Sequence, residues 1–195
     1  MVDERDDRPD RPRVFCLGLN KTGTSSFSEA MELLGLRSLH WGGPEVRRAV
    51  EAAKAEGRPL LSHLDQRYDA FSDVLPLAEH FDLLDAQYPG SRFVLTVRPV
   101  DDWIDSRRRH VENNVRRRDA GEYTGAFLVV DEDGWRQEWE RHVARVRTWF
   151  AGRSDFLELD ITHGESWGPI CALLDVPVPA APFPWVNRYS RYEPA

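Results

Sequence analysis

A short, continuously apolar run that stops abruptly at a glycine constrains the fold of this chain more than any other feature. Residues 14–17, VFCL, contain no polar side chain, which is typical of a strand buried on both faces of a parallel sheet. A polar loop, 18–26, follows at once, and apolar residues then recur at helical spacing over 24–34, with Gly35 where a helix end favours glycine. The folded part of the chain therefore begins with a strand, a glycine loop and a helix.

The alternation of strands and helices continues along the chain. Apolar runs predict strands at 60–64, 92–97 and 156–159, and helical periodicity predicts helices at 44–56, 75–87, 101–118, 135–150 and about 162–174. The last of these helices opens at a capping-box pattern formed by Thr162 and Glu165. Such alternation favours an α/β fold of three layers with a central parallel sheet, in which ligands bind beyond the carboxyl ends of the strands. We expect a single domain over residues 13–195, preceded by a charged, disordered segment, 1–12.

Composition and charge argue against several classes of protein. No stretch approaches the roughly 18 apolar residues of a membrane span, and the first residues lack the apolar middle of a signal peptide, so we expect a cytoplasmic protein without a membrane partner. The net charge of −7 argues against a general nucleic-acid surface. Cys16 and Cys171 predict buried free thiols, and the six histidines are too dispersed for a metal site. Two arginine clusters, 107–109 and 116–118, fit either a solvated helix face or a surface that gathers an acidic donor or acceptor.

The loop after the first strand has the chemistry of an anion site. Gly18 and Gly23 have the spacing of a nucleoside-triphosphate phosphate loop, but Thr24 stands where such a loop has its lysine, and Lys21 lies three positions earlier. Backbone amides at the start of a helix attract anions, and the hydroxyls of residues 24–26 add donors. Lys21 is one of two lysines among 26 basic residues. The use of lysine instead of arginine at this position therefore indicates a specific role for a compact ammonium group. The alternative is a loop that uses glycine, threonine and serine only to cap the helix.

The segment 20–25, NKTGTS, resembles the 5′-phosphosulfate loop of sulfotransferases that use 3′-phosphoadenosine-5′-phosphosulfate (PAPS). A second, independent match is Arg98 at the end of the strand 92–97, followed eight residues later by Ser106. Members of this family bind the 3′-phosphate of the donor with an arginine and a serine at this spacing. An arginine can form a bidentate fork with phosphate, and the serine lies two turns along the next helix. The alternative for the arginine is a surface ion pair with one of the aspartates at 101 and 102.

The resemblance covers nearly all of residues 13–190, is strongest to a small bacterial branch, and implies a P-loop-like sulfotransferase fold. It also implies PAPS as the donor, no metal, and the hydroxyl of a small molecule as the acceptor. Donor binding is assigned by the resemblance to Asn20, Lys21, Thr22, Gly23, Thr24, Ser25, Arg98 and Ser106. In two respects the chain departs from larger cytosolic sulfotransferases. Ser26 stands where they have a tryptophan that stacks on adenine, and their C-terminal Arg-Lys-Gly phosphate clamp is missing, although Arg188 or Arg191 could substitute for it.

Transfer of a sulfuryl group to a hydroxyl needs a base, and the resemblance places the base just before the helix that precedes the arginine strand. Asp73 is the first candidate there and Asp69 the second. Lys21 would stabilise the charge that develops on the bridging oxygen of the donor. The alternative for Asp73 is a helix N-cap, and His40 and His63 are further candidates for the base.

Two other functions remain open. A P-loop kinase or nucleotidase would want a lysine after Gly23 and an acidic residue at a strand end to hold magnesium, a place that Asp160 could take. A non-catalytic nucleotide-binding protein would keep the phosphate loop and lack the base. The sequence carries no signal for the oligomeric state or for the identity of the acceptor.

Overall fold

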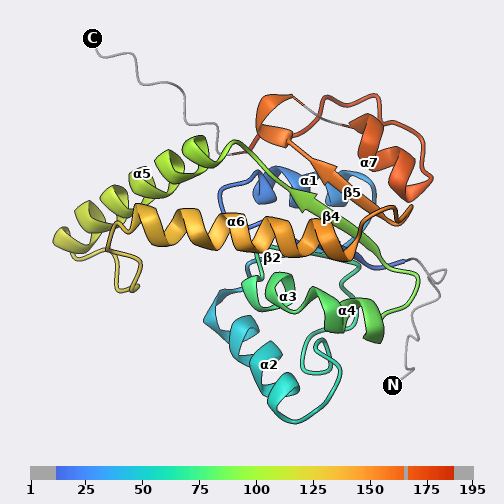
Figure 1. Cartoon of the computed structure of the whole chain (residues 1–195), viewed down its shortest axis with the longest axis horizontal. Helices are drawn as coiled ribbons and strands as arrows, with labels where there is room; N and C mark the ends of the chain where they lie inside the picture. Colours follow the sequence, from blue (N-terminus) through green and yellow to red (C-terminus); the bar gives the residue numbers. More distant parts are fainter. Residues whose placement is uncertain (1–11, 165–166, 187–195) are drawn as a thin grey trace, which may run out of the picture.

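The computed structural model describes residues 12–164 and 167–186, and a five-stranded sheet runs through its centre (Figure 1). The strands are β1 (Val14–Cys16), β2 (Ser38–His40), β3 (Ala70–Ser72), β4 (Arg92–Thr96) and β5 (Phe156–Leu159). All neighbouring strands are parallel, in the order β2-β3-β1-β4-β5. Since the chain leaves the central strand β1 toward one edge and later returns to its other side, the strand order reverses beside β1. Ligand crevices of open α/β sheets lie at such a reversal.

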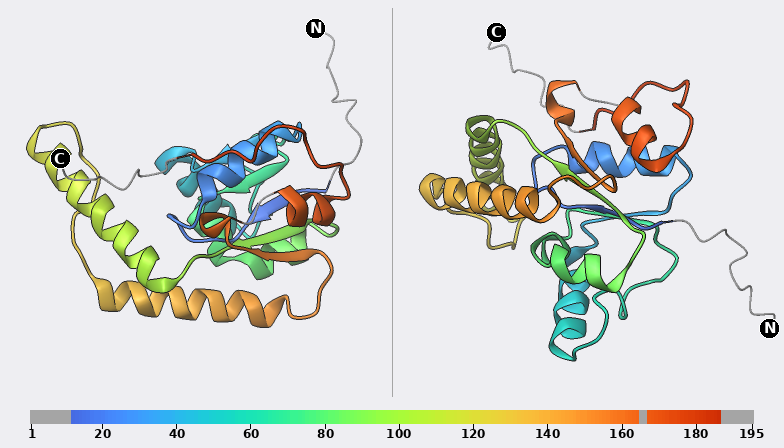
Figure 2. Two further views of the ribbon diagram at one scale, coloured as in Figure 1. Left: turned by 90° about the horizontal axis from the view of Figure 1, so that it is seen from above. Right: turned by 45° about the vertical axis from the view of Figure 1, so that its right-hand side comes forward.

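Helices cover both faces of the sheet and so make three layers (Figure 2). They are α1 (Thr24–Leu33), α2 (Gly43–Ala55), α3 (Leu75–Glu79), α4 (Phe81–Gln87), α5 (Val100–Asp119), α6 (Glu132–Trp149) and α7 (Trp167–Leu174), with a short 3-10 helix η1 (Ile161–His163). One face carries α1 and α7, and the other carries α2, α3, α4 and α6 (Figure 1, Figure 2). The predicted three-layer α/β fold with a central parallel sheet is confirmed.

Alternating side chains along β1 explain why both faces need cover. Phe15 packs in one buried cluster with Phe81 of α4 and with apolar residues of α6. Val14 packs in a second cluster with Phe27 of α1 and Ile170 of α7. A strand that is apolar on both faces is stable only between two layers of helices, which is the arrangement that the run 14–17 predicts.

Two strand predictions differ from the structure. The predicted strand at 60–64 is wrong, because this segment consists of turns. Leu60 and Leu61 are fully buried, and their amides donate to the side chains of Gln87 and Tyr88 at 2.9 Å, so their apolar character reflects burial rather than strand pairing. The strands β2 and β3 are not predicted, because their segments SLH and AFS mix apolar and polar residues and lack the continuous apolar run of β1.

Two helix predictions also need correction. Residues 75–87 form two helices, α3 and α4, because the backbone at His80 leaves the helical conformation (φ −108°, ψ 40°). The capping box is wrong at Thr162, which lies inside η1 and donates its hydroxyl to Asp160 Oδ1 (2.7 Å). The carboxylate of Asp160 caps η1 instead, because it lies nearer to the free amides of that turn. Glu165 lies outside the described residues.

Three further expectations concern the chain as a whole. Cys16 and Cys171 are buried free thiols, as predicted. Within the described ranges, no helix has the length and apolar character needed to cross a bilayer. The predicted disordered segment 1–12 falls outside the described residues except for Pro12.

Candidate active site

A cavity of about 1190 Å³ opens at the carboxyl end of the sheet. Its floor is the loop 18–26 together with the ends of β2 and β3. One wall is formed by α5, which follows β4 and extends beyond the sheet (Figure 2). The segment after β5 and the residues Trp185 and Val186 close the opposite side. The cavity thus lies where the topology of the sheet predicts a ligand site.

The loop after β1 is held tightly against β4. A Cβ atom at Gly18 would overlap the Thr96 hydroxyl, so only glycine fits at this point. Thr22 Oγ1 donates to the carbonyl of Leu19 (2.6 Å) and lies 2.7 Å from Thr96 Oγ1. The Thr22 hydroxyl is therefore engaged in the protein interior, and an anion in the cavity can reach Thr22 only through its backbone.

The loop ends at the amino terminus of α1, where the backbone has the form of an anion-binding site. Lys21 and Gly23 both adopt left-handed backbone conformations, with φ of 69° and 94°. The N-cap residue of α1 is Gly23, which has no side chain to cap the first turn. Thr24 and Ser25 line the cavity at this turn. The helix dipole and the backbone amides of the first turn together favour a bound anion.

Lys21 and Asp73 line the same cavity, and each affects the pKa of the other. Burial raises the pKa of Asp73 to about 6, although the charge of Lys21 opposes the increase. Burial likewise lowers the pKa of Lys21, and Asp73 opposes that change. Asp73 Oδ1 is buried and has no hydrogen-bond partner among the described residues. The capping alternative for Asp73 is wrong, because the N-cap residue of α3 is Val74 and no side chain caps it. A carboxylate in this state can take up a proton near neutral pH.

The other candidates for the base lie in different environments. His40 lines the cavity, with Nε2 4.0 Å from Asp73 Oδ2 and Nδ1 2.9 Å from Ser72 Oγ, and burial lowers its pKa. Asp69 precedes β3 at the opposite edge of the sheet, where its Oδ2 accepts a hydrogen bond from the backbone amide of Arg37 (3.0 Å). His63 pairs with a glutamate on the surface at 2.8 Å. Neither Asp69 nor His63 lines the cavity, so the structure brings Asp73 and His40 to the loop and leaves the other two away from it.

Arg98 reaches into the cavity from the end of β4. Its Nη1 donates to the carbonyl of Lys21 (3.1 Å), and its buried Nε has no partner among the described residues. The alternative of a surface ion pair is not observed within the described ranges, because Asp101 pairs with Arg136 and Asp102 with His163. The guanidinium of Arg98 is thus anchored by one nitrogen and has others left for an anion.

Ser106 is buried on α5 and lines the same wall of the cavity as Arg109. Burial lowers the pKa of Arg98, and the nearby positive charge of Arg109 lowers it further while Asp102 and Asp160 oppose the change. Arg109 is therefore close to Arg98. All three side chains line the cavity, and two guanidinium groups with a hydroxyl suit a doubly charged anion.

Comparison with known proteins assigns the family. The sequence profile of the sulfotransferase domain matches residues 13–192. The chain belongs to the sulfotransferase family. A curated relative, Ava biosynthesis cluster protein M of Aspergillus versicolor, is 25% identical over 212 residues, which cover 89% of this chain and 80% of that protein. The resemblance inferred from the loop and from the strand 92–97 is thereby confirmed, and the chain is a transferase of the sulfotransferase class.

Two features of this sulfotransferase site escape the sequence analysis. Arg109 could have been found from helical spacing, because it lies one turn beyond Ser106 on the same helix. The position of Trp185 has no local signal. It follows from a contact across the fold, in which the amide of Val186 donates to Ser26 Oγ (3.0 Å) and brings an aromatic ring to the cavity. Ser26 is thus occupied in holding the C-terminal segment, while Arg188 and Arg191 lie outside the described residues.

Proposed function

We propose that this sulfotransferase transfers a sulfuryl group from PAPS to a hydroxyl of a small molecule, with Asp73 as the base. The observation that carries the proposal is that Lys21 and Asp73 line one cavity beside the amino terminus of α1, near enough for each charge to act on the other. Among the described residues that line the cavity, Asp73 is the only carboxylate. It is also the group whose burial leaves it ready to accept a proton.

The residues present fit both charged ends of PAPS. The amides of loop 20–25, with the hydroxyls of Thr24 and Ser25, would hold the 5′-phosphosulfate. Arg98, Ser106 and Arg109 would hold the 3′-phosphate, because all three line the cavity and each can donate hydrogen bonds to phosphate oxygens. Arg188 remains a proposed further contact of the donor.

Transfer requires one bond to form and one to break at sulfur. The acceptor oxygen attacks the sulfur atom, and the bond between sulfur and the bridging oxygen breaks. The electron pair of that bond stays on the oxygen of the 5′-phosphate, where the ammonium of Lys21 stabilises the new charge. The hydroxyl proton of the acceptor moves to the carboxylate of Asp73. The products are the sulfated acceptor and 3′,5′-bisphosphoadenosine.

Family membership and the loop favour this function over phosphoryl transfer. Thr24 occupies the place of the phosphate-loop lysine, while Lys21 lies at the other end of the loop. A thermal-shift comparison tests the choice. We expect 3′,5′-bisphosphoadenosine to raise the melting temperature without magnesium, and ATP with magnesium to raise it much less at equal concentration. A larger shift with ATP and magnesium would support a kinase or nucleotidase.

A non-catalytic nucleotide-binding protein would show the first shift as well, so a second measurement is needed. We expect the purified protein to transfer sulfate from PAPS to a simple phenol at a rate that depends on Asp73. Binding of 3′,5′-bisphosphoadenosine without any transfer to phenols or alcohols, and without hydrolysis of PAPS, would identify a binding protein instead.

A further inference from the structure

We propose that the acceptor is itself an anion, a hydroxyaryl carboxylate whose acid group binds to Arg117 at the outer end of α5. This inference rests on the proposed function and adds the chemical class of the substrate.

The cavity is strongly basic in a protein whose net charge is −7. One carboxylate, Asp73, lines it among the described residues. The cationic side chains that line it are those of Lys21, Arg47, Arg98, Arg109 and Arg117. Since arginine stays charged at any physiological pH, the described part of the cavity presents a positive potential that an anionic ligand would neutralise.

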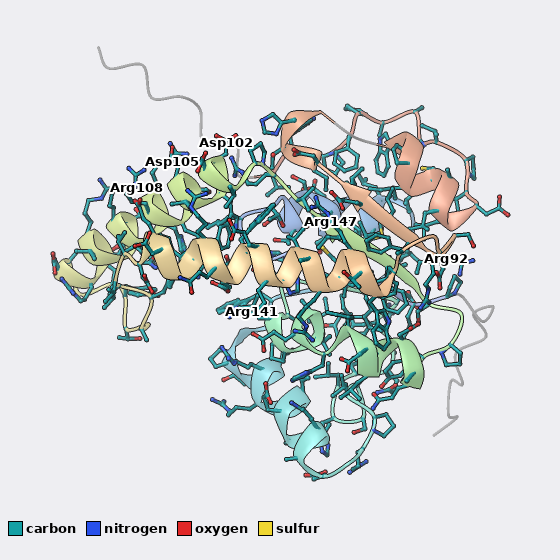
Figure 3. The ribbon with its side chains drawn as sticks, in the orientation of Figure 1. Arg92, Asp102, Asp105, Arg108, Arg141 and Arg147 are labelled. Atoms are coloured by element: carbon teal, nitrogen blue, oxygen red, sulfur yellow. The ribbon has the colours of Figure 1, made fainter. Side chains whose placement is uncertain are left out.

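Of the four arginines of α5 that do not line the cavity, three are neutralised within the protein, and Arg116 has no ion pair among the described residues. Arg107 pairs with Glu138 (2.7 Å), Arg108 pairs with Asp105 and Glu132, and Arg118 pairs with Asp119 (2.7 Å). Figure 3 shows Asp105 and Arg108 next to each other on this helix.

The two arginines of α5 that line the cavity differ from these neighbours. Neither Arg109 nor Arg117 has a carboxylate within 4.0 Å among the described residues. The contrast within one helix indicates that the cations facing the cavity are left for a ligand.

The donor accounts for Arg109 but not for Arg117. Arg109 lies close to Arg98 and would share the 3′-phosphate. Arg117 is eight residues further along α5, which places its Cα about 12 Å beyond that of Arg109 at the rise of an α-helix. One phosphate cannot occupy both positions. Arg117 therefore needs a second anion, and the acceptor is the other molecule in the cavity.

Aromatic side chains lie between the loop and Arg117. Asn114 donates to the carbonyl of Phe127 (3.0 Å), which holds the segment 120–131 against α5. The guanidinium of Arg117 donates to a carbonyl of that segment (3.3 Å) and lies 5.8 Å from the ring centre of Tyr123. The rings of His110 and Phe127 are 5.7 Å apart, and all of these side chains line the cavity. An aromatic ring in the acceptor would find matching surfaces here.

The pKa of His110 is consistent with an aromatic surface in this part of the cavity. Burial, together with the charges of Lys21, Arg107 and Arg117, lowers the pKa of His110 to about 4. His110 is thus neutral at pH 7 and serves as a ring surface. From His110 to Arg117 is about 10 Å along the helix. A phenol with a short carboxylate side chain has about this length, so with its acid at Arg117 its ring lies beside His110 and its hydroxyl points toward the end of the cavity lined by Lys21 and Asp73.

The test compares two acceptors that differ only in charge, 3-(4-hydroxyphenyl)propionate and its primary amide. With PAPS as the donor, we expect kcat/KM to be at least about tenfold higher for the acid, mainly through KM. We expect Arg117→Gln to abolish this preference. The matched control is Arg118→Gln, because Arg118 is ion-paired and does not line the cavity, and this variant should keep the preference.

Binding provides a readout that does not depend on turnover. Calorimetry with the protein saturated by 3′,5′-bisphosphoadenosine should show the acid binding at least about tenfold more tightly than the amide, and less tightly as salt is added. Equal affinities for acid and amide, or a preference that survives Arg117→Gln, would overturn the inference. If both acceptors are sulfated equally, the proposed function stands and the acceptor class is wrong. If 3′,5′-bisphosphoadenosine does not bind, the proposed function itself fails, and the inference fails with it.

Discussion

Replacing Asp73 by asparagine should make the protein more stable and almost inactive. Burial raises the pKa of Asp73 from its ordinary value of 3.8 to about 6, so the folded state holds the charged carboxylate at a cost. That difference corresponds to roughly 3 kcal/mol. Asparagine has the same size and carries no charge. It also tolerates the left-handed backbone at this position, where φ is 57°. The strain at Asp73 therefore does not increase.

The sign of the pH dependence follows from the direction of the pKa change. Between about pH 4 and 6 the folded parent binds a proton at Asp73 that the unfolded chain has lost, so its stability falls as pH rises through this range. Asp73→Asn lacks this dependence. The unfolding free energy of the variant minus that of the parent should grow by roughly 2 to 3 kcal/mol from pH 4 to 6.5 and stay constant above. Urea denaturation at several pH values measures this difference.

The rate of sulfuryl transfer should fall in Asp73→Asn, although the stability of the variant rises. An amide accepts no proton at neutral pH, so kcat should fall by about a hundredfold to ten-thousandfold while 3′,5′-bisphosphoadenosine still binds. The kcat/KM of the parent should decline as pH drops through about 6. Asp69→Asn is the control and should change neither quantity. An Asp73→Asn variant with full activity, or with a stability difference that is independent of pH, would refute this account of Asp73 and make His40 the next candidate.

Three further predictions concern the loop and the donor site. Lys21→Ala should lower turnover by roughly a hundredfold or more with a smaller effect on nucleotide affinity. Lys21→Arg should also have a low turnover, and steady-state kinetics with PAPS measure both variants. Calorimetry should show that binding of 3′,5′-bisphosphoadenosine is weaker by about 2 to 3 kcal/mol in Arg98→Ala and by about 1 kcal/mol in Ser106→Ala. Binding of adenosine 5′-monophosphate should weaken much less, and equal losses for both nucleotides would reject the assignment. Gly18→Ala should destabilise the protein by about 2 kcal/mol or more in urea, because its Cβ has no room, whereas Gly168→Ala, which meets no atom within 4 Å, should be neutral or stabilising.

The sequence predicts the features of the site that depend on local spacing. The anion loop and the pair Arg98 and Ser106 can be recognised because their chemistry lies within nine consecutive positions each. Asp73 and Asp69 cannot be distinguished in this way. They flank the three-residue strand β3, so one lies at the carboxyl edge beside the cavity and the other at the opposite edge. Only the strand decides between them, and its segment AFS lacks the continuous apolar run by which β1 is recognised.

Contacts between distant segments are also invisible in the sequence. Trp185 reaches the cavity through the hydrogen bond between Val186 and Ser26, which are far apart along the chain. The basic character of the cavity depends on which arginines of α5 face inward, and a cluster such as 116–118 does not reveal this. The structure separates Arg117, which lines the cavity, from Arg118, which pairs with an aspartate.

The central position of β1 has a consequence for how the molecule folds. Val14 pairs with Ala70 on one side and with Arg92 on the other, so β1 finds its first neighbour only after a long stretch of chain has been ordered. Contacts of such high sequence separation make folding slow, since the closure of long loops precedes the gain from pairing. The loop 18–26 follows β1 directly, yet the contact of Thr22 with Thr96 at the end of β4 joins positions 74 residues apart. The loop therefore takes its final shape only once β4 lies beside β1, and a ligand that binds this loop should stabilise the folded state without accelerating the steps that precede this pairing.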